Sequence, residues 1–142
     1  MKVVISGSRS CTDEKLIEEA IQEGIKELDI TPTVFIHGDA VGVDKISGKI
    51  CERLGFTVVK YPAKWKDVKG KPASEIKENK FGKYWVKAGF DRNQVMADNA
   101  DALIAIDLGT SGTMDMITRA KKAGLKVYVY SPEQEECFGF DF

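Results

Sequence analysis

The stretch ADALIAIDLGTSGT, residues 100–113, decides the fold. Its first half contains Ala102 to Ile106, which is apolar at every position and is typical of a strand buried on both faces of a parallel sheet. Its second half, Asp107 to Thr113, is rich in Gly, Ser and Thr and leads directly into a helical pattern. A buried strand, a Gly-rich turn and a helix in this order predict one unit of an open α/β sheet.

The same alternation continues on both sides of this stretch. Further strands are expected at Val3–Ile5, Thr33–Ile36, Thr57–Val59 and Leu125–Tyr130. Helices are expected at Leu16–Leu28 with Thr12 as N-cap, at Val43–Leu54, at Arg92–Asn99 and at Gly112–Lys122. The sequence therefore predicts one α/β domain over residues 1–142, a Rossmann-like three-layer sandwich with a mainly parallel sheet of about five strands.

Composition fits an ordinary globular protein, with 43% hydrophobic and 30% charged residues. No apolar run approaches the roughly 20 residues of a membrane helix, so we expect no membrane partner. Three cysteines, an odd number without a C-x-x-C pair, favour a cytoplasmic location. The net charge of −1 argues against nucleic acid as a partner. One histidine, His37, and no paired cysteines predict neither a metal site nor a cofactor.

Two segments interrupt the strand-helix rhythm. The first, an insertion at about residues 66–90, is rich in lysine and is expected to be mobile and to cover a ligand. Four aromatic residues in or beside it are expected to pin it to the body or to stack on a base: Trp65, Tyr84, Trp85 and Phe90. The second is the tail at residues 131–142, which is acidic and carries phenylalanine at every second position from Phe138. We expect the tail to dock on protein, in the same subunit or a neighbour of a homo-oligomer.

Three Gly-rich turns follow three strands whose carboxyl ends meet at one edge of the sheet. Glycine lets the backbone approach a ligand, and the amides at a helix N-terminus favour an anion. Arg92, just before the fourth strand, adds a side chain that can hold a phosphate with two hydrogen bonds. We therefore expect the following residues to bind a phosphate-bearing ligand: Gly7, Ser8, Arg9, Gly38, Asp39, Gly42, Asp44, Arg92, Asn93, Gly109, Ser111, Gly112 and Thr113.

Several of these motifs resemble one family. The run Arg92–Ala97, then Ala100–Ala105, then Gly112-Thr113, is similar to the SLOG superfamily, which joins the Smf/DprA proteins and the LOG phosphoribohydrolases. The turn Gly38–Asp44 resembles the G-x-A-x-G-x-D signature of its small YAcAr-like branch, and so does Tyr61–Trp65. The resemblance implies a Rossmann-like fold that binds nucleotides or nucleotide-derived signals.

The chain departs from the phosphoribohydrolase pattern at one catalytic position. That branch pairs an arginine, matched here by Arg92, with a glutamate, where this chain has Met116. Cleavage of an N-glycosidic bond develops positive charge at the sugar and needs a nearby carboxylate. If the protein is such an enzyme, Arg92 with Asp39 or Asp115 would be its catalytic residues.

Three functions follow from these observations. The first is binding of a phosphate-bearing nucleotide or nucleotide-derived signalling molecule, for sensing or sequestration. The second is hydrolysis of a nucleotide N-glycosidic bond, so the sequence leaves open whether the protein is an enzyme. The third is binding of single-stranded nucleic acid through the lysines of the insertion.

Overall fold

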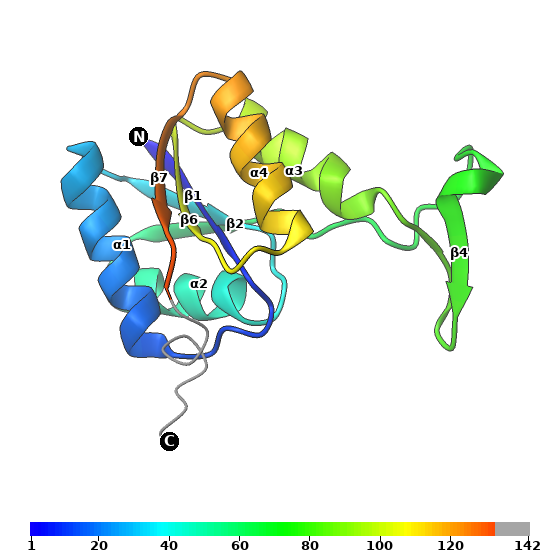
Figure 1. The fold of residues 1–142 in the computed structure, drawn as a ribbon, viewed down its shortest axis with the longest axis horizontal. Coiled ribbons are helices and arrows are strands. Elements are labelled where there is room, and N and C mark those ends of the chain that lie inside the picture. Colours follow the sequence, from blue (N-terminus) through cyan, green and yellow to red (C-terminus); the bar gives the residue numbers. More distant parts are fainter. Residues whose placement is uncertain (133–142) are drawn as a thin grey trace.

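The computed structural model describes residues 1–132 of the chain (Figure 1). Five strands form one sheet in the order β3-β2-β1-β6-β7, and every neighbouring pair is parallel. These strands are β1 (Lys2–Gly7), β2 (Val34–His37), β3 (Thr57–Lys60), β6 (Ala102–Ile106) and β7 (Lys126–Tyr130). The predicted Rossmann-like α/β fold, with a parallel sheet of about five strands, is confirmed.

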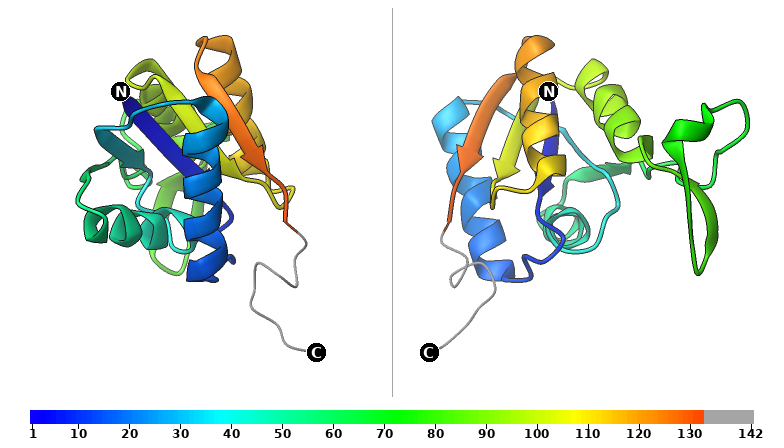
Figure 2. Two further views of the ribbon diagram at one scale, coloured as in Figure 1. Left: turned by 90° about the vertical axis from the view of Figure 1, so that its left-hand side faces the viewer. Right: turned by 45° about the vertical axis from the view of Figure 1, so that its right-hand side comes forward.

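Helices cover both faces of the sheet, giving three layers (Figures 1 and 2). One face packs against α1 (Glu14–Leu28) and α2 (Val43–Arg53), and the other against α3 (Ala88–Asp98) and α4 (Ser111–Lys122). Successive side chains of a strand point to opposite faces of the sheet. Val3 therefore belongs to the hydrophobic core between the sheet and α1 and α2, and Val4 to the core between the sheet and α3 and α4. All five residues of β6 are buried, as its unbroken apolar run predicts for a strand covered on both faces.

Two helix starts differ from the expectation. Asp13, and not Thr12, caps α1, because its carboxylate accepts a hydrogen bond from the Leu16 amide at 3.2 Å. Helix α3 begins at Ala88 and not at Arg92, so Arg92 lies in its second turn. Gly89 concealed this start, because a glycine inside a pattern weakens a helix prediction.

The insertion contains a β-hairpin that the sequence analysis missed. A 3-10 turn at Ala73–Glu75 precedes β4 (Ile76–Asn79), which pairs antiparallel with β5 (Gly82–Trp85). The hairpin projects away from the body, so in this structure it does not cover the edge of the sheet (Figures 1 and 2). Its strands are short and mostly polar, which leaves little of the alternation that identifies a half-buried strand.

Some expectations lie beyond what this structure describes. The tail prediction falls on residues 133–142, outside the described residues, and its docking and the homo-oligomer remain predictions. Within residues 1–132, no helix is long and apolar enough to cross a membrane. In the same range no group of three or more His, Cys, Asp or Glu residues is arranged to hold a metal ion.

Candidate functional site

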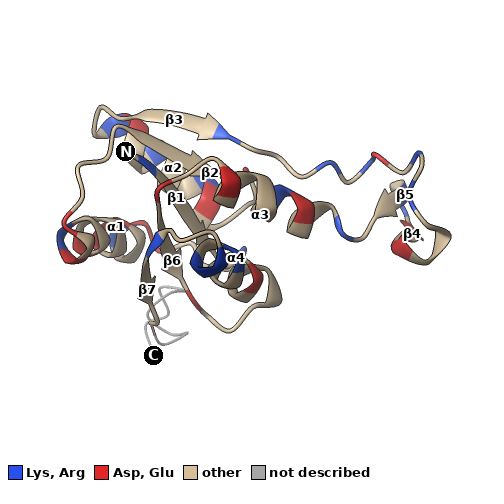
Figure 3. Ribbon diagram, turned by 90° about the horizontal axis from the view of Figure 1, so that it is seen from above, with Lys and Arg blue, Asp and Glu red and all other residues tan. Residues whose placement is uncertain are grey.

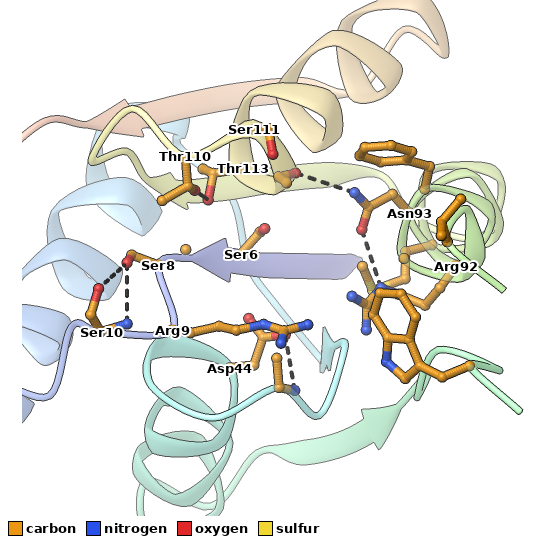
Figure 4. Close-up of a pocket in the computed structure, with 18 residues that line it drawn as sticks. Ser6, Ser8, Arg9, Ser10, Asp44, Arg92, Asn93, Thr110, Ser111 and Thr113 are labelled. Atoms are coloured by element: carbon orange, nitrogen blue, oxygen red, sulfur yellow. Dashed lines mark hydrogen bonds between the residues drawn. The ribbon is translucent and has the colours of Figure 1, made fainter. Parts of the chain in front are cut away.

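A cavity of about 380 Å³ opens at the carboxyl ends of β1 and β6. In the sheet, β2 and β3 lie on one side of β1, and β6 and β7 lie on the other side. The strand order therefore reverses between β1 and β6, where the cavity lies. In open α/β sheets, ligands bind in the crevice at such a point. Its walls come from the turn after β1, the start of α4, one side of α3, the start of α2 and Trp65 (Figure 4).

The turn after β1 is held in place by packing and by its own hydrogen bonds. A side chain at Gly7 would meet the Val43 side chain at 2.7 Å, so only glycine lets α2 approach this closely. The Ser8 carbonyl accepts a hydrogen bond from the Val43 amide at 3.2 Å. The Ser8 hydroxyl oxygen lies 2.9 Å from the hydroxyl oxygen of Ser10. Arg9 is exposed and extends along the cavity (Figure 4). Its guanidinium carbon lies 5.8 Å from the Trp65 ring centre.

The first turn of α4 forms the opposite wall. Its N-cap, Thr110, makes no capping hydrogen bond, and the turn contains no acidic residue. The first amides of an α-helix have no partner within the helix, so those of Ser111, Gly112 and Thr113 can meet an anion. Nothing lies within 4 Å of the point where a Gly112 side chain would begin. Glycine there is not required by the protein's own packing, which leaves the backbone open to a ligand.

Arg92 reaches from α3 into the cavity and also ties the strand ends together. One terminal nitrogen, Nη1, donates hydrogen bonds to the carbonyls of Gly38 and Tyr61. Its Nε donates to Asn93 at 3.2 Å. A side chain at Gly38 would collide with this guanidinium, so the glycine makes room for Arg92. Arg92 is therefore both a wall of the cavity and a brace for the β2 turn.

Asp44 is the carboxylate that lines the cavity. It is 6% exposed, and its Oδ2 accepts hydrogen bonds from the amides of Gly38 and Ala40 at 3.1 and 3.3 Å. Burial raises the pKa of Asp44 to about 6, although the charge of Arg92, these two amides and the charge of Arg9 all oppose the rise. Among residues 1–132, the cavity is thus lined by two arginines and by one carboxyl group whose pKa burial raises well above its usual range.

Asn93 and Asp115 form a network between α3 and α4. The Asn93 amide nitrogen donates to the Gly112 carbonyl at 3.2 Å and to Asp115 at 3.0 Å. Asp115 also accepts a hydrogen bond from Arg119 at 2.8 Å and does not line the cavity. Met116, at the position where the phosphoribohydrolase pattern has its catalytic glutamate, is fully buried in the core. The network positions the first turn of α4 against Arg92.

Asp39 and His37 lie outside the cavity. Asp39 has a positive φ of 58° and forms an ion pair with Lys45 at 3.1 Å. His37 is buried beside Gly48, and its Nδ1 accepts a hydrogen bond from the Asp39 amide at 2.9 Å. Burial lowers the pKa of His37, which favours the neutral ring. Both residues shape the turn after β2.

The predicted residues therefore separate into two groups. Those that line the cavity are Gly7, Ser8, Arg9, Asp44, Arg92, Asn93, Ser111, Gly112 and Thr113. Those expected there that lie outside it are Gly38, Asp39, Gly42, Gly109 and Asp115. Of the proposed catalytic residues, only Arg92 lines the cavity, and the catalytic roles remain a prediction.

Several further lining residues were not among those expected to bind the ligand: Ser6, Ser10, Ala40, Met96 and Thr110. Val86, Gly89 and Phe90 also line the cavity and belong to the segment that was expected to cover the ligand. Trp65 and Phe90 are two of the aromatic residues that were expected to stack on a base or to pin that segment. Ser6, Ser10, Ala40 and Thr110 lie next to residues that were predicted to bind the ligand. The sequence therefore identified the correct turns, but not every residue in them that lines the cavity. Trp65 belongs to the Tyr61–Trp65 motif, and it both lines the cavity and packs against Tyr84 of the hairpin.

Comparison with known proteins supports the resemblance found in the sequence. The YAcAr family, described as YspA, cpYpsA-related SLOG family, matches residues 1–67. The resemblance to the YAcAr-like branch of SLOG is confirmed over those residues. No curated protein matches the chain significantly. The fold is similar to that of DNA processing protein A from Helicobacter pylori, at 18% identity and a TM-score of 0.55, over 98% of this chain and 69% of that one.

This likeness corrects one expectation. The structure of DNA processing protein A describes its mode of binding single-stranded DNA. Because a protein of the same fold binds single-stranded DNA, the argument from net charge against nucleic acid as a partner is wrong. The net charge of −1 averages over the chain, whereas lysines recur along the projecting hairpin segment (Figure 3). Local charge, and not the total, decides whether a surface attracts a polyanion.

Proposed function

We propose that the cavity binds the phosphate of a nucleotide or nucleotide-derived small molecule. The observation that carries this proposal is that Arg9, Arg92 and the first turn of α4 line one cavity at the point where the strand order reverses. Two guanidinium groups and the positive end of a helix dipole outweigh the single carboxylate of Asp44. A phosphate would replace water at these donors with charge-assisted hydrogen bonds.

The rest of the cavity suits the sugar and base. Its volume of about 380 Å³ falls in the usual range of small-molecule sites, roughly 300–1,000 Å³. Ser6, Ser10 and Thr110 offer hydroxyl groups for a ribose, and Trp65 and Phe90 offer aromatic surface for a base. The ligand is therefore proposed to lie across the cavity, with its phosphate at Gly112 and its base toward Trp65.

Titration calorimetry with AMP, ADP-ribose and 3′,5′-cyclic AMP tests this function. We expect at least one of these ligands to bind, and Arg92→Ala to weaken its binding by about 1.5–3 kcal/mol, the range for hydrogen bonds to charged groups. Arg9→Ala should weaken binding without unfolding the protein, because Arg9 is exposed. Arg53→Ala, which removes an equal charge from a surface ion pair with Glu18, is the control. Failure of all three ligands to bind at millimolar concentration would contradict the proposal.

Gly112→Ala should separate binding from stability. Among residues 1–132, a methyl group at this position meets no atom within 4 Å, but it would stand where the phosphate is proposed to lie. We expect binding to weaken at least tenfold, while the free energy of unfolding stays the same or rises by up to about 1 kcal/mol, because alanine is the better helix former. Calorimetry and urea unfolding measure the two effects. Binding equal to that of the wild type would mean that the phosphate lies elsewhere.

Binding of single-stranded nucleic acid is a second candidate function. The similarity to DNA processing protein A favours it, and so do the lysines of the projecting segment (Figure 3). A phosphate within or at the end of a strand would use the same cavity donors as a free nucleotide. The two functions differ in whether binding extends beyond one nucleotide.

A further inference from the structure

A second hollow lies beside the cavity, between the turn after β1 and the hairpin. Its volume is about 420 Å³, and its lining residues are Arg9, Trp65, Lys66, Asn79, Phe81 and Tyr84. Arg9 and Trp65 also line the main cavity, so the two hollows share a wall. A ligand that fills the main cavity and continues past Arg9 enters the second hollow.

The aromatic residues Trp65, Phe81 and Tyr84 line this hollow, and two of them belong to the hairpin. The rings of Trp65 and Tyr84 meet edge to face, with centres 6.4 Å apart. The Trp85 amide donates to the Trp65 carbonyl at 2.8 Å, which fixes the hairpin to the Trp65 segment. Phe81, at the tip of the hairpin, is 72% exposed. An aromatic side chain that the fold leaves this exposed has its face available for stacking.

Hydrogen bonds hold the backbone of the tip, and the Lys80 ammonium lies 5.1 Å from the centre of the Phe81 ring. Asn79 accepts a hydrogen bond from the Phe81 amide at 2.8 Å, and the Lys66 ammonium donates to the Phe81 carbonyl. Gly82, at a φ of 105°, completes the turn. The backbone that carries the ring is thus held in place, so stacking of a base requires ordering of the Phe81 side chain and not of the whole tip.

The charge of the hollow suits a phosphodiester. Of the lining residues that fall within residues 1–132, Arg9 and Lys66 are cationic and none is acidic. Aromatic faces together with cations that follow the backbone are the combination by which proteins bind single-stranded nucleic acid.

We propose that this hollow is a second nucleotide subsite, and that the preferred ligand is a single-stranded oligonucleotide of at least two units. The first unit occupies the main cavity, so this inference rests on the proposed function. The phosphodiester that follows passes between Arg9 and Lys66, and the second base stacks among Trp65, Tyr84 and Phe81. The hairpin therefore extends the binding site beyond one nucleotide, and does not close over it.

The test compares AMP with the 5′-phosphorylated adenosine dinucleotide pApA by titration calorimetry at constant low salt. We expect the wild type to bind pApA about tenfold more tightly than AMP, since stacking of one base on an aromatic side chain contributes about 1–3 kcal/mol and a tenfold change corresponds to about 1.4 kcal/mol. Phe81→Ala should remove this gain and leave AMP binding unchanged. Lys66→Ala should reduce the gain. Phe81 is exposed, so its replacement leaves the fold intact.

Two matched controls remove similar groups elsewhere. Lys83→Ala removes a charge from the same hairpin outside the hollow, and Leu54→Ala shortens an exposed apolar side chain at the end of α2. Both should keep the full gain for pApA. AMP binding without a gain for pApA, or a gain that survives in Phe81→Ala, would overturn the subsite and leave the proposed function standing. Phe81-dependent binding of pApA while AMP, ADP-ribose and 3′,5′-cyclic AMP all fail to bind would support the subsite and contradict the mononucleotide proposal. If pApA does not bind, the subsite is wrong, and if the three smaller ligands also fail to bind, both proposals fail.

Discussion

Asp44→Asn is expected to change how the stability of the protein depends on pH. Burial raises the pKa of Asp44 from 3.8 to about 6 in the folded protein, so the folded state binds a proton more tightly than the unfolded chain. The stability that this proton contributes is fully present below pH 3.8 and is lost as the pH rises through about 6. Between pH 4 and pH 8, the unfolding free energy of the wild type minus that of Asp44→Asn should therefore fall by about 2–3 kcal/mol.

Urea unfolding at five pH values between 4 and 8 measures this difference. Asparagine keeps a side-chain oxygen that can accept from the Gly38 and Ala40 amides, so the variant should fold. Asp98→Asn, at an exposed carboxyl of α3, gives the baseline for removing one negative charge. A difference that rises with pH would mean that Arg92 and Arg9, and not burial, dominate the environment of Asp44. A constant difference would mean that the two effects cancel.

The fold could be predicted from the sequence because its signals are local. The apolar run Ala102–Ile106 and the helical spacing of the flanking segments identify the elements, and parallel pairing follows from their alternation. The hairpin at Ile76–Trp85 could not be found in this way, because it buries little and has few apolar residues to alternate. Contacts with Trp65 and Glu75, distant from its turn, hold it in place.

The position of the candidate site could be predicted from the sequence, but the role of each residue in it could not. Gly-rich turns mark the cavity edge, yet the same residue type serves packing at Gly38 and an open approach at Gly112. Which carboxylate faces the cavity depends on how the first turn of each helix is rotated about the helix axis. The spacing of residues in the sequence does not determine that rotation closely. Asp39 and Asp115 are near in sequence to lining residues, but ion pairs turn them toward Lys45 and Arg119. Asp44 lines the cavity, because its amide partners lie in the turn after β2.

Gly42 gives the clearest case of a glycine required by packing, and Gly42→Ala is expected to be strongly destabilising. Its φ of 81° and ψ of −132° lie in a region that residues with a side chain rarely adopt. An added methyl group would stand 2.4 Å from the Arg9 carbonyl oxygen and 2.6 Å from that of Ser8. Both are backbone atoms, so relief requires movement of the whole turn after β1. Backbone strain of roughly 1–3 kcal/mol and overpacking of roughly 1–3 kcal/mol add to a loss of about 2–6 kcal/mol.

Gly55→Ala separates these two contributions. Gly55 also has a positive φ, 91°, but nothing lies within 4 Å of its added side chain. Its replacement should cost only the conformational part, about 1–2 kcal/mol. Urea unfolding of both variants measures the difference, which isolates the collision with the turn after β1. The same collision would displace Arg9, so Gly42→Ala protein that remains folded should also lose affinity for the nucleotide, whereas Gly55→Ala should keep it. Equal destabilisation by the two substitutions would mean that the turn after β1 yields to the added methyl group, and that Gly42 does not hold Arg9 in position.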